Sequence, residues 1–241
     1  MSASCRSSHA FKTYARQMLR SVNAPPRTVQ KAFATMTVVT TTSPPNAPSN
    51  ARTPAYEIAP LFLSRWSQRA LTGEEIPDRV LFTAFEAARW APSGSNTQPW
   101  RFIYAKRNSS RWADFLGLLN ERNRLWAAQA SALVVFVSAT ERNTPEGLRP
   151  HRSHSFDTGA AWSAFAHQAS LLGWSTRAMG GFDVEAAQRV LAVPANYRVE
   201  VVVAIGKPAS ADSLHESFRE AEKPTDRLPL DQLVAEGQFA F

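Results

Sequence analysis

The run Ala-Leu-Val-Val-Phe-Val-Ser-Ala at residues 132–139 constrains the fold more than any other stretch of the sequence. A continuous apolar run of this length, rich in β-branched residues, indicates a strand buried inside a sheet. Two other segments, Arg101–Ala105 and Arg198–Ile205, also have strand character, and helical patterns precede and separate the strands, most clearly at Glu74–Trp90 and Ser155–Leu172. The pattern therefore predicts a layered domain of the α+β or α/β class.

The charge of the 241-residue chain is unevenly distributed. Its formal net charge of +7 lies entirely in the first 53 residues, which contain seven Lys or Arg and no acidic residue, so the remaining body is neutral. A neutral body does not favour a nucleic-acid partner. The sequence contains no run of about 18 apolar residues, so we expect no membrane span. The single cysteine, Cys5, excludes an internal disulfide and fits a reducing compartment, so we expect a cytoplasmic protein.

Residues 1–53 are rich in Ser, Thr, Arg and Pro, and we expect a disordered tail because this composition cannot bury a core. Their basic, acid-poor first half is typical of an organelle transit segment, which would change the expected location. Translation starting at Met36 is the alternative explanation. The predicted organisation is therefore a basic tail at 1–53 and one folded domain at 54–241.

The loop Trp90–Trp100 is the strongest candidate for a binding element. Small, hydrogen-bonding residues follow a helical run and precede a Pro-Trp pair that opens a strand. Such a loop can bring its backbone and hydroxyls close to a flat polar ligand. An ordinary helix-to-strand connection is the alternative interpretation.

Several familiar motifs are absent from the sequence. No Gly-x-Gly-x-x-Gly or Walker loop supports a Rossmann or P-loop nucleotide site. The histidines of the body do not have zinc-ligand spacing, so we expect no metal and interpret them as solvated or capping residues. Gly94-Ser95-Asn96 is not the elbow of a serine nucleophile.

Separated segments resemble, in order, the motifs of the FMN-dependent nitroreductase family. They are Arg65-Trp66-Ser67-Gln68-Arg69, Ala87–Ser93 continued by Asn96-Thr97-Gln98-Pro99-Trp100, Asn123, Met179-Gly180-Gly181-Phe182-Asp183, Ala204-Ile205-Gly206 and Arg227-Leu228-Pro229. The resemblance covers about residues 60–235. It implies an α+β fold with a central, mostly antiparallel sheet flanked by helices, and a homodimer with FMN at its interface.

The resemblance also implies which residues bind the cofactor. The family places phosphate contacts at Arg65, Ser67 and Arg227, and guanidinium groups suit a dianionic phosphate because they bind it with bidentate geometry. Trp66 lies within the same signature. In the family, the residues at the positions of Pro92, Ser93 and Asn96 contact the flavin from the partner subunit. Asn123 resembles the family's asparagine that hydrogen-bonds the pyrimidine edge of the flavin.

No side chain is expected to act as nucleophile or general acid, so the functional groups are those that tune the flavin. Reduction places negative charge at flavin N1 and the C2 carbonyl, where Arg69 is the candidate cation by position. Gly180 and Gly181 are expected to present backbone N–H groups to N5, because glycine permits close approach.

Two departures from the family pattern limit the transfer of these roles. Thr225 stands where some relatives carry a second phosphate-facing Lys, and Gly180 replaces an acidic residue of some members. Four further residues are candidates for a substrate pocket, although each fits a core or capping role better. They are Trp126, Phe156, Asp157 and Trp162.

The resemblance implies an oxidoreductase in which NAD(P)H reduces the bound flavin. The flavin then passes hydride to a nitroaromatic, quinone or enone-like acceptor in a ping-pong cycle. Different flavin chemistry on the same fold, such as reductive dehalogenation or oxidation, is one alternative. A non-catalytic flavin-binding protein is another.

Overall fold

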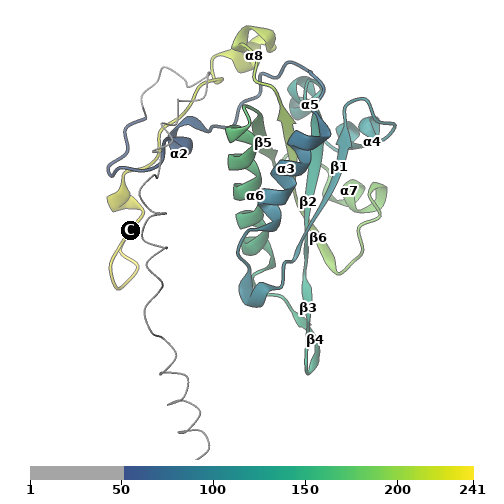
Figure 1. Ribbon diagram of the computed structural model, residues 1–241, viewed down its shortest axis with the longest axis vertical. Coiled ribbons are helices and arrows are strands. Elements are labelled where there is room, and N and C mark those ends of the chain that lie inside the picture. The colour runs from purple at the N-terminus through teal and green to yellow at the C-terminus, as the bar shows by residue number, and fades with distance from the viewer. Residues whose placement is uncertain (1–51) are drawn as a thin grey trace, which may run out of the picture. The chain divides into compact units, whose positions relative to one another are not determined.

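A computed structural model describes residues 52–241, so most of the predicted tail lies outside the described residues. Its main sheet contains β1 (Trp100–Lys106), β2 (Ala132–Ala139), β6 (Tyr197–Gly206) and β5 (Ser175–Met179). The strand order is β1-β2-β6-β5 and every neighbouring pair is antiparallel (Figure 1). This arrangement confirms the α+β class and the antiparallel sheet. The apolar run at 132–139 forms β2, which is buried along nearly its whole length.

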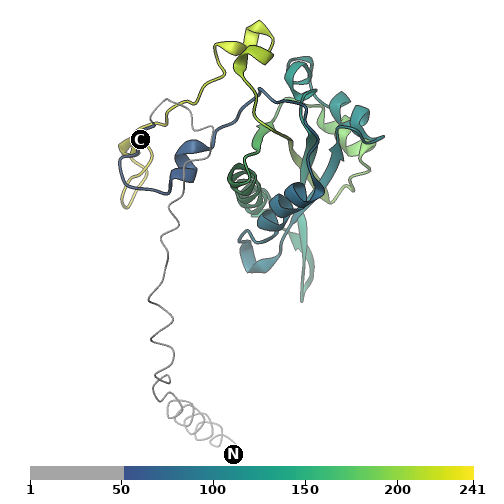
Figure 2. The same cartoon turned by 45° about the horizontal axis from the view of Figure 1, so that its top comes forward.

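Helices cover both faces of this sheet, which explains why β2 is apolar at successive positions. On one face lie α3 (Asp78–Arg89) and α6 (His154–Leu171), packed against Val134 and Phe136. On the other face lie α4 (Trp112–Gly117), α5 (Glu121–Ala127) and α7 (Val184–Val190), packed against Leu133 and Val135 (Figure 2). Alternating side chains of one strand therefore serve two separate cores.

Local sequence signals set several helix boundaries. Pro77 lies at the N-cap of α3, so this helix begins four residues after the Glu74 expected from the pattern. Asn120 caps α5, and its side chain accepts a hydrogen bond from Asn123 N at 2.9 Å. Asp183 caps α7 in the same way, through Ala186 N.

Other elements differ from the sequence prediction or were not predicted. The short helix α2 covers Pro60–Ser64, and the backbone turns extended at Arg65. An exposed hairpin of β3 (Glu141–Thr144) and β4 (Gly147–Pro150) precedes α6. Neither the hairpin nor β5 has a clear alternating pattern, so neither was found in the sequence.

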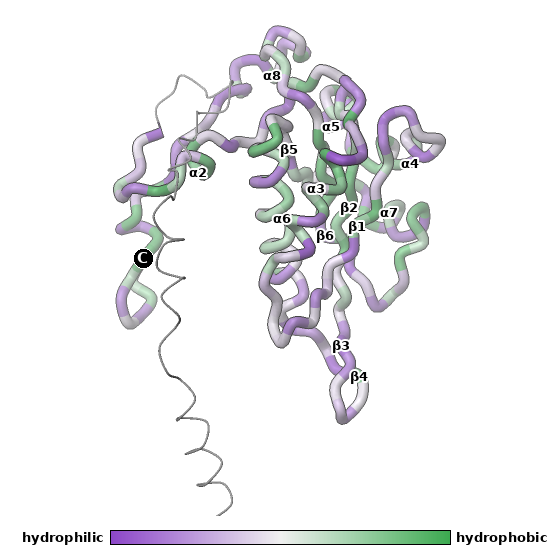
Figure 3. Tube along the Cα trace, in the orientation of Figure 1, coloured by the Kyte–Doolittle hydropathy of each residue, from purple (hydrophilic) through white to green (hydrophobic). Residues whose placement is uncertain are grey.

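The chain after β6 is mostly irregular. It contains η2 (Ala211–Ser213), α8 (Glu216–Arg219) and η3 (Leu230–Gln232). A cavity of about 560 Å³ lies between the segment around α2 and residues 225–233. Phe62, Leu228 and Leu233 are among the residues that line it. Figure 3 shows apolar character at α2 as well as along the central strands. Within residues 52–241, no helix is long and apolar enough to cross a membrane.

We expect Phe165→Ala to lower the free energy of unfolding by about 3–5 kcal/mol, because it leaves a cavity in the core between α6 and the sheet. Phe165 is fully buried and contacts Phe85, Phe136 and Trp162. The control Leu125→Ala removes an exposed side chain and should cost about 0.5 kcal/mol or less. Urea unfolding of both variants measures the difference, and equal losses would contradict this view of the core.

Candidate functional site

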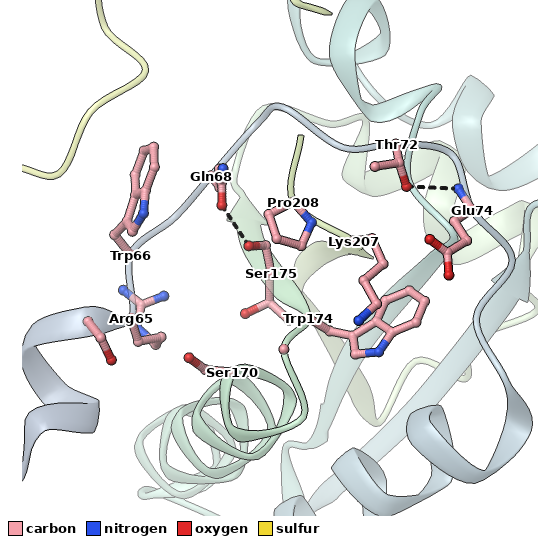
Figure 4. A pocket seen from close by; sticks show the side chains of 13 residues that line it. Arg65, Trp66, Gln68, Thr72, Glu74, Ser170, Trp174, Ser175, Lys207 and Pro208 are labelled. Atoms are coloured by element: carbon pink, nitrogen blue, oxygen red, sulfur yellow. Dashed lines mark hydrogen bonds between the residues drawn. The ribbon is translucent and has the colours of Figure 1, made fainter. Parts of the chain in front are cut away.

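The extended segment Arg65–Ala70 is the centre of the candidate site. It crosses the first half of β5, where Ser175 Oγ donates to Gln68 Oε1 at 2.8 Å and Arg177 donates to the backbone oxygen of Ser67. Figure 4 shows Gln68 turned toward Ser175 beside a polar pocket of about 240 Å³ that Lys207 and Trp174 also line. These contacts fix the segment on the sheet.

A buried carboxylate, Glu222, holds the same segment from the C-terminal side. Its side chain is 1% exposed. One oxygen accepts hydrogen bonds from the backbone N–H groups of Arg69 and Ala70, and the other lies 3.3 Å from Arg69 Nη1. No sequence signal identified Glu222, because it is separated from Arg69 by 153 positions and lies in an irregular stretch.

Five predicted site residues line one cavity of about 280 Å³, which we call the cationic cavity. They are Arg65, Trp66, Ser67, Arg69 and Arg227. Three further basic residues line it as well, namely Arg52, Arg177 and Lys223. Within residues 52–241 only Arg69 of this set forms an ion pair, the one with Glu222.

The electrostatics of the cationic cavity show an excess of positive charge. Burial and the nearby Arg52 and Arg227 lower the pKa of Arg65. Burial and the nearby Arg69 lower the pKa of Arg177, against a smaller opposing effect of Glu222. Guanidinium groups that repel one another around a cavity are stabilised by a bound anion. The cavity therefore fits a multiply charged anionic group such as a phosphate.

A neighbouring cavity of about 330 Å³ shares Arg65, Ser67 and Arg227 with the cationic cavity. It also borders α6, through Trp162, Ala166 and His167. An aromatic wall beside an anion site suits a ligand that joins a flat ring to a phosphate.

Asn123 and Gly181 form a second part of the candidate site, at the end of β5. Asn123 Nδ2 donates to Gly181 O at 3.0 Å. A Cβ atom on Gly181 would lie 2.3 Å from Asn120 Nδ2 and 2.9 Å from Asn123 Nδ2. A side chain at Gly181 would therefore displace the amide groups of Asn120 and Asn123. Gly180 differs, because a Cβ atom there would meet no atom within 4 Å, and its open side is free for a ligand.

The predicted loop residues Pro92, Ser93 and Asn96 lie away from the cationic cavity and do not line it. Their loop contacts the beginning of α6, where Gly94 N donates to Asp157 Oδ2 at 3.2 Å. His167, near the other end of α6, borders the cavity of Arg65. His167 follows Asp157 by ten positions, which corresponds to about 15 Å of helix. One chain therefore does not bring this loop to the cationic cavity.

A buried polar cluster holds the loop in a strained conformation. Ser95, Asn96 and Gln98 have φ values of 51°, 54° and 48°, in the left-handed region. Asp157 accepts hydrogen bonds from Gly94 N and from Ser153 Oγ, the latter at 3.0 Å. Strained backbone that is fixed by surrounding contacts is common at functional sites.

The remaining candidate residues and the histidines differ in burial. Asp157 and Trp126 are buried, as a core role requires, whereas Phe156 is 82% exposed. His151 is buried, its Nε2 lies 3.1 Å from Thr97 Oγ1, and Ser153 holds the N-cap position of α6, so the interpretation of His151 as a solvated or capping residue was wrong. His215 caps α8. Across residues 52–241, no group of three His, Cys, Asp or Glu residues is placed to hold a metal ion.

Residues 63–207, more than half of the chain, match the family model described as the nitroreductase family. The chain belongs to this family. A solved structure described as an oxidoreductase containing FMN is 43% identical to this nitroreductase-family chain, with a TM-score of 0.78. The similarity covers 80% of this chain and 98% of that chain.

Two curated relatives are more distant. A Streptomyces coelicolor protein that carries the name NADH dehydrogenase/NAD(P)H nitroreductase is 29% identical over 177 residues, covering 66% of this chain and 86% of the relative. Iodotyrosine deiodinase 1 of Sus scrofa is 24% identical over 206 residues, covering 75% of this chain and 68% of the relative.

We expect Gly181→Ala to destabilise the protein by about 1 kcal/mol or more, because the new Cβ displaces Asn120 and disturbs the cap of α5. The matched control Gly180→Ala adds the same methyl group into open space and should leave stability nearly unchanged. Thermal unfolding of both variants without ligand compares them directly. A larger loss for Gly180→Ala would contradict the placement of the two glycines.

Proposed function

We propose that this protein is an FMN-dependent oxidoreductase that takes electrons from NAD(P)H and reduces a nitroaromatic, quinone or enone-like acceptor in a ping-pong cycle. The observation that carries the proposal is the cationic cavity, whose basic residues are mostly not neutralised within residues 52–241. The 43% identical structure described as containing FMN supports the identity of the ligand. When bound, FMN supplies the hydride chemistry that the protein's own side chains do not provide.

The residues of the cationic cavity fit the phosphate of FMN. Arg65 and Arg227 supply guanidinium donors with the fork geometry that phosphate oxygens accept, and Ser67 adds a hydroxyl. The extended backbone of Arg65–Ala70 and its buried contact with Glu222 hold Arg65 and Ser67 in place. Phosphate binding there would direct the remainder of the ligand along α6, toward Trp162.

Arg69, Asn123, Gly180 and Gly181 are proposed to place and tune the flavin ring. Arg69 forms an ion pair with Glu222, so it is a weaker electrostatic partner for the flavin than a lone guanidinium would be. Arg177, which lines the same cavity without an ion pair within residues 52–241, adds positive charge nearby. Gly180 leaves space for close approach at the end of β5.

A homodimer would complete this site. The loop with Ser93 and Asn96 contacts the first turn of α6, whereas the cavity beside the cationic cavity borders the middle and second half of this helix, so a partner that packs antiparallel along α6 would bring its loop toward the cationic cavity. The outward face of α6 suits such packing, because it exposes Phe156, Gly159 and Leu171. We therefore propose that each flavin contacts both subunits.

The shared site predicts complementation between two defective chains. Arg65→Ala removes a phosphate ligand, and Asn96→Ala alters the loop, so each homodimer should bind little FMN. A heterodimer purified through two different tags has one intact site, with Arg65 from one chain and Asn96 from the other. Its flavin content should reach about half of the wild-type value. A heterodimer as defective as the two homodimers would show that both residues act within one chain.

The reaction is tested by the visible spectrum of the purified protein before and after anaerobic addition of NADH or NADPH. We expect a flavin absorbance band that bleaches on addition of a pyridine nucleotide and returns when a quinone or nitroaromatic acceptor is added. The nucleotide that bleaches it faster identifies the preferred donor. A protein that takes up no added FMN would contradict the proposal.

Reductive dehalogenation is a second candidate, favoured by the similarity to iodotyrosine deiodinase 1. The reduced protein distinguishes the two reactions when it is mixed separately with an iodinated phenol and with a quinone. Release of iodide at a rate above that of quinone reduction would favour dehalogenation, and the reverse would support the first proposal.

A further inference from the structure

The cationic cavity includes a guanidinium from outside the family match. Arg52 lines the cavity together with Arg65, Ser67 and Arg227, yet it lies upstream of residue 63, where the match begins. It is also the one basic residue of the first 53 that falls within the described range, 52–241. The sequence pattern assigned Arg52 to the basic tail and gave it no role.

Two hydrogen bonds hold Arg52 beside Arg65. Its Nη1 donates to Leu63 O at 3.0 Å and to Arg65 O at 3.1 Å, both at the end of α2. Its Nε is buried and has no hydrogen-bond partner within residues 52–241. A buried N–H without an acceptor costs free energy, so this donor favours a ligand that brings an oxygen atom.

The charges around Arg52 also favour an anion. Burial, followed by the nearby Arg227, lowers the pKa of Arg52, and the nearby Asp226 opposes this effect. Asp226 forms no ion pair with Arg52 in the described part of the chain. Three guanidinium groups, from Arg52, Arg65 and Arg227, therefore converge on one cavity without a neutralising carboxylate in contact.

We propose that Arg52 is a further ligand of the FMN phosphate, acting beside Arg65 and Arg227. The inference rests on the proposed FMN function and extends the cofactor site to a segment upstream of the family domain. It also accounts for Thr225, which lines the same cavity where some relatives carry a Lys. Arg52 supplies from the N-terminal side the positive charge that Thr225 lacks.

The test compares FMN with riboflavin, which has the same ring but no phosphate. Dissociation constants for both flavins are measured by fluorescence quenching on the full-length chain, in the wild type, Arg52→Ala, Arg52→Lys and the control Arg79→Ala. Arg79 is exposed on α3 and lines none of the cavities described above. We expect Arg52→Ala to weaken FMN binding about tenfold and to leave riboflavin binding unchanged, because one charge-assisted contact to phosphate is lost. Arg52→Lys should give an intermediate loss for FMN alone.

The other outcomes contradict either the role of Arg52 or the proposed function of the protein. An equal loss of affinity for FMN and riboflavin would show that Arg52 only braces the end of α2 and would overturn the inference. Unchanged FMN binding in Arg52→Ala would overturn it as well. A wild-type protein that binds neither flavin would overturn the proposed function itself. Thermal unfolding of the ligand-free variants separates a loss of affinity from a loss of folding.

Discussion

The contact of Glu222 with the backbone of Arg69 and Ala70 is the constraint on which the rest of the site depends. A carboxylate that is 1% exposed is costly to bury unless hydrogen bonds and a countercharge compensate it. Two N–H groups and the guanidinium of Arg69 provide that compensation. The segment Arg65–Ala70 is consequently held extended, and its side chains line the cationic cavity instead of continuing α2.

The cationic cavity stores electrostatic repulsion that a ligand would relieve. Arg52, Arg65 and Arg177 all have pKa values below that of a free guanidinium, with burial as the largest cause and a neighbouring arginine as the next. Structural ion pairs show the opposite arrangement, because there each cation meets a carboxylate. Unbalanced positive charge in a partly buried cavity is typical of a site for phosphate.

Local patterns predicted much of the fold, and contacts between distant segments explain what they missed. The apolar run of β2 and the long helix α6 depend on neighbouring residues, so the sequence located them closely. The stop of α2 at Ser64 coincides with contacts from other segments, since Arg52 donates to Leu63 O and Arg65 O and Arg177 donates to Ser67 O, and local propensity does not detect such contacts. Arg65, Ser67 and Arg227 come from segments far apart in sequence, so no local pattern predicts that they line one cavity. The family resemblance assigned them the same role and thereby predicted it. Arg52 and Arg177 have no motif and were found only through the cavity that they line.

The position of the flavin phosphate in a crystal structure of the FMN-bound protein tests this account most directly. We expect the phosphate oxygens within hydrogen-bond distance of Arg65, Ser67 and Arg227, with the loop of Ser93 and Asn96 from a second subunit against the same flavin. A phosphate bound instead beside Lys207 and Trp174, in the pocket of Figure 4, would contradict the assignment of the cationic cavity.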